Sequence, residues 1–495
     1  MTINIKDFTI TLPTNLDRIL KKIDKNLKGL VFVVDEKNKL LGSISDGDIR
    51  RGFIKKKVGE VVSITSKFIN LKPFFLNYKT ETKNILYHLQ SKKNKNKFKC
   101  IPLVDANKII KDISTIENLR RYPIANLNLS NQELGNAFDA IKSGWISSKG
   151  AYVDEFEKSF SKYIGGGYSV TTSSGTTALE LALKTFEIGK GDEVILPNFS
   201  FAASINSIIN VGATPVVVDV EQDTWTIDVE KITKKITKKT KAIMPVHIYG
   251  QPCKLDEIIK IAKSKKIYVI EDAAEALGAT YKGKKIGLNG DCSCFSFYAN
   301  KIITTGEGGM VVFKNKKNSE YASLIKNHGM SLKTTYYHTA VGANFRMTNP
   351  QAAIGLAQLN RISELYKLRK KAFDYYDKNL KKNNFIKFLP KNKWSKNSLW
   401  LYTITLGNLK KKKRDILIKK LLAKGIETRP GFVSFNQMKI YKKYCKGTYP
   451  VSSKISNSSL SLPTTNLSHE DQNYIISQLL FEIDKLNKSL NYNNE

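Results

Sequence analysis

The chain has 495 residues, which at roughly 150 residues per domain predicts about three structural units. Its hydrophobic share of 41%, with 23 Phe and 22 Tyr, supplies enough apolar surface for a substantial core and excludes wholesale disorder and collagen-like repetition. No apolar run approaches the roughly 18 residues that span a bilayer, and the first residues form no signal-like segment. We therefore expect a cytosolic protein without a membrane partner.

The charge balance is strongly basic, since 81 Lys and Arg against 44 Asp and Glu give a formal net charge of +37. Such a charge is typical of proteins that bind nucleic acid or an anionic surface. Only 10 of the 81 basic residues are Arg, whereas proteins that read base edges rely on bidentate Arg. Enrichment in Lys, Asn and Ile is also what an AT-rich genome produces, so we predict no nucleic-acid partner.

Cysteine and histidine positions indicate neither disulfides nor a metal. The five cysteines form no Cys-x-x-Cys pair and fit a reducing compartment. The five histidines are too widely spaced in the sequence for a metal-ligand motif.

The N-terminal segment contains an internal repeat. Apolar strands are expected over residues 29–35 and 40–45, with a polar turn between them and a helix after them. The same pattern returns over residues 99–105 and 109–114, which indicates two copies of one small unit.

This segment resembles a CBS-domain pair, a regulatory module that often binds adenosine nucleotides. The ribose-binding pattern of that family is present as Gly42, Ser45 and Asp48. In the second copy Lys111 and Glu117 align with the Gly and the Asp, so at most one complete nucleotide site is expected. The alternative is that these residues only shape a strand-to-helix turn.

After the repeat, strands and helices alternate in the rhythm of a mainly parallel, helix-covered sheet. Strands are expected at residues 168–172, 193–197, 214–220, 241–247 and 267–270. A helical stretch is expected from Asn349 to Leu380, followed by a strand at 399–406 and helices at 412–424 and 469–486. The predicted domains are a CBS-pair-like regulatory domain (1–118), a linker (119–128), a large α/β domain (129–380) and a small C-terminal α+β domain (381–495).

Three motifs in the α/β domain point to a pyridoxal phosphate site. Residues 173–177 form a small-residue turn that follows a strand and opens a helix, where free backbone N–H groups favour a phosphate. Asp272 follows an apolar strand at the carboxyl edge of the sheet, where a carboxylate can keep a pyridine nitrogen protonated. Lys301 precedes a Gly-rich turn, and a lysine amine forms a Schiff base with an aldehyde cofactor. A helix cap is the alternative for the first two motifs, and a surface amine for the third.

Residues 271–309 resemble the central block of the DegT/DnrJ/EryC1/StrS family of sugar aminotransferases, which have the fold type I architecture of aspartate aminotransferase. The resemblance extends over most of residues 122–490. Further matching segments are residues 143–148, 174–176, 197–201, 246–250, 344–347 and 427–430.

The resemblance implies roles around the cofactor ring. Lys301 would be the Schiff-base lysine, Asp272 the partner of the ring nitrogen, and Phe201 the residue stacked on the ring. Glu275 would lie near the cofactor hydroxyl, where many relatives have His or Gln. In this glutamate the chain is similar to GDP-perosamine synthases. Relatives that remove the C3 hydroxyl carry His at the position of Lys301, so transamination is favoured.

The resemblance also implies which residues bind the phosphate and the substrate. Gly175, Thr176 and Ser296 would bind the phosphate, while Asn344 would reach it from the second subunit of a homodimer or larger oligomer. The expected substrate contacts are Trp145, Ser147 and Arg429.

These observations predict an aminotransferase that converts a nucleotide-linked 4-keto-6-deoxyhexose, preferably a GDP-sugar, to the 4-amino sugar. Glutamate would be the donor, and the product would enter surface polysaccharide synthesis. One alternative is the same chemistry on a UDP-linked or 3-keto sugar. Another is a nucleotide-sensing regulatory protein that retains a pyridoxal phosphate scaffold, against which intact Lys301 and Asp272 argue.

Overall fold

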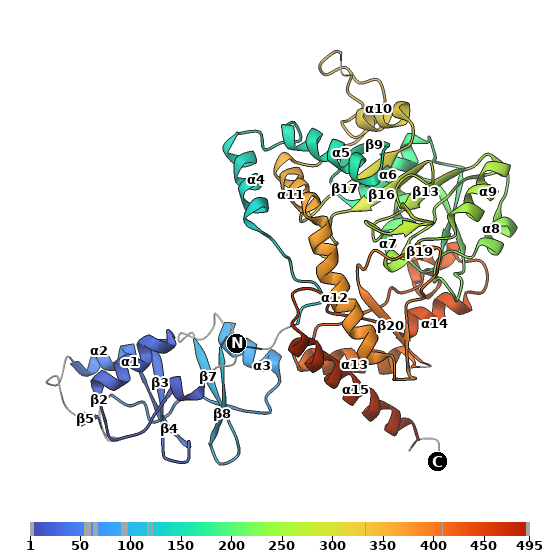
Figure 1. Cartoon of the computed structure of the whole chain (residues 1–495). Helices are drawn as coiled ribbons and strands as arrows, with labels where there is room; N and C mark the ends of the chain where they lie inside the picture. Colours follow the sequence, from blue (N-terminus) through green and yellow to red (C-terminus); the bar gives the residue numbers. More distant parts are fainter. Residues whose placement is uncertain are drawn as a thin grey trace. The chain divides into compact units, whose positions relative to one another are not determined.

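The computed structural model describes residues 4–53, 61–62, 68–90, 98–115, 119, 122–331, 333–407 and 409–491. Contacts divide the chain into two compact units (Figure 1). The first comprises residues 1–122 and 419–427, and the second comprises residues 123–418 and 428–495. Among the helices described, none is long and apolar enough to cross a membrane.

The first unit contains two similar three-stranded sheets, each made of a hairpin with a short parallel strand beside it. The first sheet has the strands β1 (Thr9–Ile10), β3 (Leu30–Val34) and β4 (Leu40–Ser45), and the second has β6 (Leu76–Asn77), β7 (Cys100–Val104) and β8 (Ile110–Thr115). The remaining elements are η1 (Ile5–Asp7), β2 (Thr14–Asn15), α1 (Leu16–Asn26), α2 (Asp46–Phe53), β5 (Val61–Val62) and α3 (Thr82–Gln90).

The two hairpins pair through their turns. Asp35 and Asp105 occupy the same place in the two turns, where each carboxylate accepts two backbone N–H groups. Leu40 N donates to Lys108 O at 2.9 Å, and Ile110 N donates to Asn38 O at 3.0 Å. These reciprocal bonds relate the copies by a local two-fold axis, and the repeat predicted from the sequence is confirmed.

The strand register corrects one part of the repeat alignment. Gly42 pairs with Val33 in the first hairpin, and Asp112 pairs with Leu103 at the matching place in the second. The equivalent of Gly42 is therefore Asp112 and not Lys111, and the equivalent of Ser45 is Thr115. Glu117, predicted to match Asp48, lies outside the described residues. The sequence alignment was wrong by one residue because it matched the apolar Ile44 with Ile113, whereas the strand pairing makes Ser114 the equivalent of Ile44.

The second unit is built on a seven-stranded sheet (Figure 1). The strands are parallel except β17, which runs antiparallel to both of its neighbours. In spatial order they are β11 (Thr214–Val218), β10 (Glu193–Pro197), β12 (Thr240–Ile243), β13 (Tyr268–Asp272), β16 (Cys292–Ser296), β17 (Gly309–Phe313) and β9 (Tyr168–Thr172).

Helices cover both faces of this sheet because its strands are apolar on both sides. Ile195 of β10 faces one core, whereas its neighbours Val194 and Leu196 face the other. The first face is covered by α5 (Ala151–Ile164), α8 (Val229–Lys235), α9 (Leu255–Lys265) and α11 (Asn349–Asn360). The second is covered by α6 (Gly175–Thr185), α7 (Ala202–Asn210) and α10 (Lys316–Ile325).

The C-terminal part has an antiparallel sheet in the order β18 (Ile386–Phe388), β20 (Tyr402–Leu406), β22 (Ser459–Leu462) and β21 (Arg429–Pro430). Its helices are α13 (Lys411–Ala423), α14 (Pro450–Ser458) and α15 (His469–Asn491). A small sheet joins β15 (Lys284–Lys285), β14 (Thr280–Tyr281) and β19 (Ser395–Lys396), and the remaining short helices are η2 (Ile248–Gly250), η3 (Phe435–Gln437) and η4 (Lys439–Tyr444). The predicted domain boundary after residue 380 falls at the end of α12 (Ile362–Leu380) and stays a prediction.

Several element boundaries differ from the sequence prediction, and for three of them the backbone gives the reason. The helical stretch predicted from Asn349 to Leu380 is two helices, α11 and α12, because Arg361 leaves the helical region with φ −112° and ψ 19°. The strand predicted from residue 399 begins at Tyr402, since Leu399 has φ 62°. The strand β12 ends at Ile243, short of Pro245, which has no N–H to donate.

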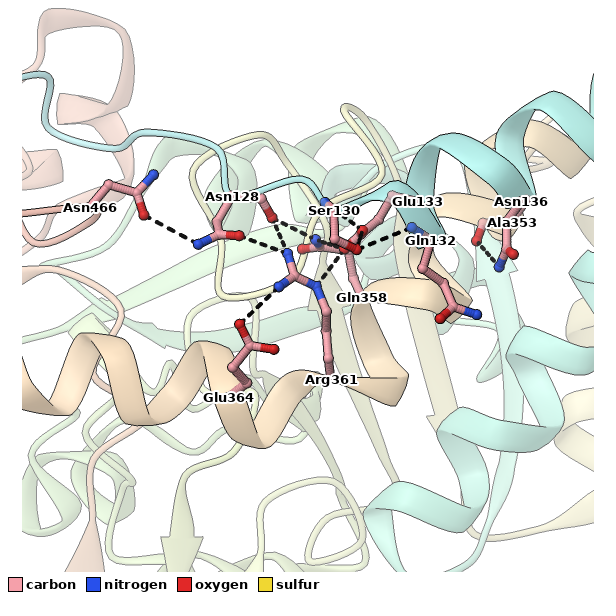
Figure 2. Close-up of polar contacts among 10 residues, drawn as sticks. All are labelled: Asn128, Ser130, Gln132, Glu133, Asn136, Ala353, Gln358, Arg361, Glu364 and Asn466. Atoms are coloured by element: carbon pink, nitrogen blue, oxygen red, sulfur yellow. Dashed lines mark hydrogen bonds and ion pairs between the residues drawn. The ribbon is translucent and has the colours of Figure 1, made fainter.

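A buried polar cluster explains the break at Arg361 (Figure 2). Glu133, at the start of α4 (Asn131–Lys142), is 1% exposed and accepts from Arg361 Nε at 2.7 Å and from Gln358 Nε2 at 2.5 Å. Burial would raise the pKa of Glu133, but hydrogen bonds from Ser130, Arg361 and Gln358 lower it to about 2. Arg361 also donates to Asn128, so the cluster ties the chain before α4 to the junction of α11 and α12.

Candidate active site

The predicted cofactor residues gather at one edge of the seven-stranded sheet. The strands β9, β13 and β16 run in the same direction, so their carboxyl ends meet at this edge. Ser173 to Gly175 follow β9, Asp272 ends β13, and Ser296 ends β16. Open α/β sheets bind ligands at this edge, as the sequence analysis expected.

The turn after β9 is the amino end of helix α6. Ser174 is the N-cap, and its hydroxyl accepts from Thr177 N at 3.1 Å while Thr177 Oγ1 accepts from Ser174 N at 2.9 Å. The helix cap, which is the alternative to phosphate binding for residues 173–177, is therefore present. It fixes the first turn of the helix without engaging the backbone N–H groups of Gly175 and Thr176 in those two bonds.

Gly175 is required by its close approach to Ser296. A Cβ added at Gly175 would lie 2.8 Å from Ser296 Cβ and 3.2 Å from Ser296 Oγ. Two of the predicted phosphate residues, from different strand ends, are therefore neighbours. Because the helix dipole adds positive potential there, the arrangement suits an anion.

Asp272 is buried, with 5% of its surface exposed. Ser204 Oγ, on α7, donates to Asp272 Oδ2 at 2.7 Å, and Ala274 N donates to Oδ1 at 3.2 Å. Burial raises the pKa of Asp272, while the two hydrogen bonds and the charge of Lys301 act in the opposite direction. The carboxylate is thus oriented by fixed donors and lies within electrostatic range of Lys301.

Lys301 lies in the turn between β16 and β17. Its Nζ is 3.7 Å from the centroid of the Trp400 ring, a cation–π distance. Burial and the charge of Arg369 lower the pKa of Lys301, whereas Glu275 and Asp272 raise it. Removal from water thus favours the neutral amine, which is the nucleophilic form.

Glu275 is the third charged residue of this group. It is 7% exposed, and its Oε2 accepts from Tyr249 N at 2.5 Å. Burial raises the pKa of Glu275 to about 7, although Lys301 and the Tyr249 N–H act to lower it. The side chain can therefore donate or accept a hydrogen bond near neutral pH.

Glu271, next to Asp272 in the sequence, has a structural role. Its carboxylate is fully buried and accepts from Gly290 N at 2.6 Å and Ser293 Oγ at 2.9 Å, with His247 Nε2 at 3.0 Å. His247 Nδ1 in turn accepts from Cys253 N at 3.1 Å, so the ring carries its proton on Nε2. Among the residues described, no group of three or more His, Cys, Asp and Glu side chains could hold a metal ion.

Phe201 and the predicted substrate residues are more exposed. Phe201 is the N-cap of α7, is 58% exposed and lies 5.8 Å from the Phe432 ring centroid. Trp145 is 59% exposed, and Asn349 holds the loop that carries it and Ser147 through their backbone carbonyls. Arg429 lies on the short strand β21, with an exposed side chain.

Asn344 lies beside the turn after β9. Its exposed side chain accepts from Arg346 Nε at 2.9 Å, and the next residue, Phe345, accepts from Ser173 N through its carbonyl at 2.8 Å. The segment is therefore adjacent to the phosphate turn of its own chain. A cross-subunit role for Asn344 stays a prediction.

In the first unit, Ser45 and Asp48 meet at the start of α2. Ser45 Oγ donates to Asp48 Oδ2 at 2.6 Å, and Arg51 pairs with Asp48 Oδ1 at 2.5 Å. Hydrogen bonds from Ser45 and Arg51 lower the pKa of Asp48 despite partial burial. Gly42 is needed because a Cβ there would lie 2.9 Å from Asn70 O.

Sequence reasoning missed four residues that complete the site. They are Ser204, which holds Asp272, Tyr249, which holds Glu275, and Trp400 and Arg369, which contact Lys301. Tyr249 lies in a segment that the sequence analysis matched without assigning a role. No sequence pattern indicated Trp400 or Arg369, because each comes from an element more than 60 residues away from Lys301.

Comparison with known proteins agrees with this geometry. A model of the DegT/DnrJ/EryC1/StrS aminotransferase family matches residues 128–480, and a CBS domain model matches residues 2–55. The chain is 41% identical over 366 residues to GDP-perosamine synthase of Caulobacter vibrioides, covering 74% of this chain and 99% of that protein. It is 40% identical over 363 residues to GDP-perosamine synthase of Escherichia coli O157:H7, covering 73% and 98%. The solved PMP form of the putative sugar aminotransferase Spr1654 from Streptococcus pneumoniae superposes with a TM-score of 0.72 at 30% identity, covering 76% of this chain and 100% of that one.

Proposed function

Because the chain belongs to the DegT/DnrJ/EryC1/StrS aminotransferase family, we propose that it transfers the amino group of glutamate to a nucleotide-linked 4-keto-6-deoxyhexose. The product would be a 4-amino-4,6-dideoxy sugar for surface polysaccharide synthesis. The observation that carries this proposal is the buried group of Lys301, Asp272 and Glu275 at the carboxyl edge of the sheet. The similarity to two GDP-perosamine synthases over nearly their whole length supports a GDP-linked substrate.

The cofactor is pyridoxal phosphate, and the residues present fit it. The amino end of α6 and the close approach of Gly175 to Ser296 suit its phosphate. A buried carboxylate at Asp272 suits its ring nitrogen, and a buried amine at Lys301 suits its aldehyde. When bound, the cofactor supplies an electron sink for the substrate carbon that gains or loses the amine.

The chain's own residues would divide the work as follows. Gly175, Thr176 and Ser296 bind the phosphate, and Phe201 covers one side of the ring. Asp272, held by Ser204, keeps a proton on the ring nitrogen. Glu275 contacts the ring hydroxyl.

Lys301 would act twice. As a neutral amine it would hold the aldehyde carbon of the cofactor, with release of water, and after a substrate amine has displaced it the freed amine would move a proton to or from the substrate carbon. Lys301 Nζ lies 3.7 Å from the centroid of the Trp400 ring, so the indole would contact the freed amine. Trp145, Ser147 and Arg429 are the proposed contacts to the nucleotide sugar.

We also propose that the active unit is at least a dimer in which Asn344 of one protomer reaches the phosphate bound by the other. The N-terminal unit contains a CBS domain over residues 2–55, and Ser45 and Asp48 are the proposed contacts to the ribose of an adenosine nucleotide.

A substrate panel tests the proposal. Purified holoenzyme with glutamate is incubated with GDP- and UDP-linked 4-keto-6-deoxy sugars and with a 3-keto isomer, and products are identified by mass spectrometry. We expect amination of the GDP-linked 4-keto sugar with the highest kcat/KM. Amination of only the UDP-linked or the 3-keto sugar would reassign the substrate. No amination of any sugar by cofactor-loaded protein would favour a regulatory protein on a retained scaffold.

A further inference from the structure

Arg369 is a buried arginine whose hydrogen bonds are directed at the active site. It lies on α12 and is 6% exposed. Its Nη2 donates to Lys301 O at 2.9 Å, and its Nη1 donates to Trp400 O at 2.5 Å. One guanidinium thus joins the backbone of the lysine to the backbone of the residue whose ring contacts the lysine amine.

Within the described ranges no Asp or Glu forms an ion pair with Arg369, and burial lowers its pKa to about 10. A buried charge without a counter-charge costs free energy, so the burial of Arg369 depends on the hydrogen bonds that its guanidinium donates. Arg414 offers a contrast, because it is equally buried and donates to Ser456 O and Ser459 O, but Asp415 pairs with it at 2.8 Å.

The geometry around Lys301 depends on these contacts. Trp400 Nε1 donates to Asn300 O at 3.0 Å, and Lys301 Nζ lies 3.7 Å from the Trp400 ring centroid. Three contacts therefore connect Trp400 with residues 300–301. Arg369 bridges the carbonyls of Lys301 and Trp400, the indole N–H donates to Asn300, and the amine of Lys301 lies over the indole ring. Removing Arg369 would leave two buried carbonyls without these donors.

The charge of Arg369 also affects the protonation of the Lys301 amine. Lys301 is faced by the carboxylates of Glu275 and Asp272, which raise its pKa, and by Arg369, which lowers it. Burial is the largest cause that lowers the pKa of Lys301. The arginine thus opposes the two carboxylates that would otherwise hold the amine protonated.

The helix that carries Arg369 is itself fixed. Arg361, eight residues earlier and just before α12, is anchored by Glu133 and Asn128 (Figure 2). Arg369 lies about two helical turns after this anchored residue. Arg369 and Lys301 line a small pocket together with Asn128 and Gln358, among other residues.

We propose that Arg369 is a positioning residue for the reaction: its guanidinium holds the carbonyls of Lys301 and Trp400, so that the amine and the ring beneath it keep one relative placement. This inference rests on the proposed role of Lys301. A displaced amine would reach the cofactor aldehyde and the substrate proton less often, and small displacements of a reacting group lower rates strongly.

The test compares Arg369→Met and Arg369→Lys with Arg414→Met, which removes an equally buried arginine elsewhere. In the cofactor-free full chain, the pKa of the Lys301 amine is measured by competitive labelling with an amine-reactive reagent across pH, with mass spectrometry of the Lys301 peptide. We expect a higher Lys301 pKa in Arg369→Met and an unchanged one in Arg414→Met, although both variants lose thermal stability.

Arg369→Lys keeps the charge but lacks the planar fork that reaches two carbonyls. We expect it to keep the Lys301 pKa near that of the wild type and to lower kcat roughly tenfold or more, with KM for the sugar little changed. If Arg369→Met does not fold, this split in Arg369→Lys decides the question. Wild-type kcat in Arg369→Lys, or equal Lys301 pKa values in Arg369→Met and Arg414→Met, would overturn the proposal.

The outcome is separable from failure of the proposed function. Labelling reports on the Lys301 amine without cofactor or substrate. If Lys301 were not the cofactor lysine, Lys301→Ala would keep cofactor binding and turnover, whereas the pKa comparison among the arginine variants would still stand.

Discussion

At the scale of single residues, the environment of Lys301 separates it from the other 70 lysines of the chain. Most lysines lie on the surface, where a solvated ammonium is the stable form. Lys301 is instead enclosed by an indole ring, two carboxylates and a buried guanidinium, and burial lowers its pKa. This enclosure therefore favours the neutral, nucleophilic form of the amine more than a surface position does.

Replacing Lys301 by Ala should abolish both the absorption band of the protein-bound cofactor and turnover, because no other lysine that the structure describes has the same surroundings. Lys326→Ala is the control, since Lys326 is also enclosed, with a side chain 14% exposed and an ion pair to Glu157 at 2.9 Å. We expect Lys326→Ala to keep the band. Retention of the band and of turnover in Lys301→Ala would refute the assignment of the lysine.

Glu275 should give stability an unusual dependence on pH. Burial raises the pKa of Glu275 to about 7 in the folded protein, whereas the ordinary glutamate value of 4.5 applies in the unfolded chain. Between pH 4.5 and pH 7 the folded chain therefore holds a proton that the unfolded chain has lost. The free energy of unfolding should therefore fall as pH rises from 4.5 to 7, by up to roughly 3 kcal/mol, and this contribution should then level off.

Urea unfolding of the cofactor-free protein between pH 5 and pH 8 measures this dependence. Glu275→Gln should remove the decrease, whereas the exposed Glu307→Gln should leave it in place. A decrease of the same size in Glu275→Gln would assign the titration to another group.

At the scale of elements, the amino end of helix α6 packs closely against the carboxyl end of strand β16. The reciprocal cap by Ser174 and Thr177 fixes the first turn, and Gly175 lets that turn approach Ser296 at the end of β16. The sequence identified the helix start from local residues. The proximity of Ser296, more than 100 residues later, comes from the β9–β17–β16 pairing.

Gly175→Ala should displace Ser296 and lower the free energy of unfolding by about 1–3 kcal/mol, the usual cost of an overpacked contact. Affinity for the cofactor should fall with it, measured by dialysis against a series of cofactor concentrations. Gly135→Ala on α4 is a control of opposite sign. An added Cβ there meets no atom within 4 Å, so alanine should stabilise that helix by about 0.5–1 kcal/mol.

If Gly175→Ala binds the cofactor as the wild type does, the approach of Ser296 to the helix is not needed for phosphate binding. The phosphate would then have to be assigned to residues outside this turn.

At the scale of the whole molecule, two proposals concern assembly and regulation. The segment of Asn344 lies beside the phosphate turn of its own chain, through the bond from Ser173 N to Phe345 O. A role across a two-fold axis requires that the same edge also meets the partner's site, which an isologous dimer allows.

Mixing an inactive Lys301→Ala protein with an inactive Asn344→Ala protein should restore activity, because each hybrid dimer contains one site with both residues intact. With random exchange the mixture should reach roughly one quarter of wild-type activity. Native mass spectrometry establishes that exchange has occurred. An active monomer, or exchange without recovery, would count against a shared site.

The CBS domain should bind an adenosine nucleotide through Ser45 and Asp48, whose side chains meet at 2.6 Å. Calorimetric titration of the full chain with ATP, ADP, AMP and S-adenosylmethionine should give heat with at least one ligand, and Asp48→Ala should abolish it. Asp17→Ala, at an exposed carboxylate of α1, is the control. The absence of binding would leave the module a structural or docking domain.

The stoichiometry of that titration is informative because of the corrected register. One site per chain is expected, since Asp112 replaces the glycine in the second copy. Two sites would contradict this prediction and assign the second to the copy that carries Thr115.

The sequence by itself determined the features that local chemistry encodes. Short segments of apolar and β-branched residues gave the strands β9, β10 and β13 within a residue or two, and the repeated hairpin of the first unit. The aminotransferase family followed from short motifs around Asp272 and Lys301. These features are readable because each depends on neighbours within one turn or one strand.

Only the tertiary structure decided the contacts between distant segments. Arg369 and Trp400 reach Lys301 from later elements, Ser204 orients Asp272, and the cluster of Glu133 and Arg361 divides one predicted helix into two. The one-residue register of the second hairpin was likewise fixed by backbone pairing and not by side-chain pattern. The physical reason is common to all of them: hydrogen bonds and burial act between groups that are close in space, and a single sequence records only which groups are close along the chain.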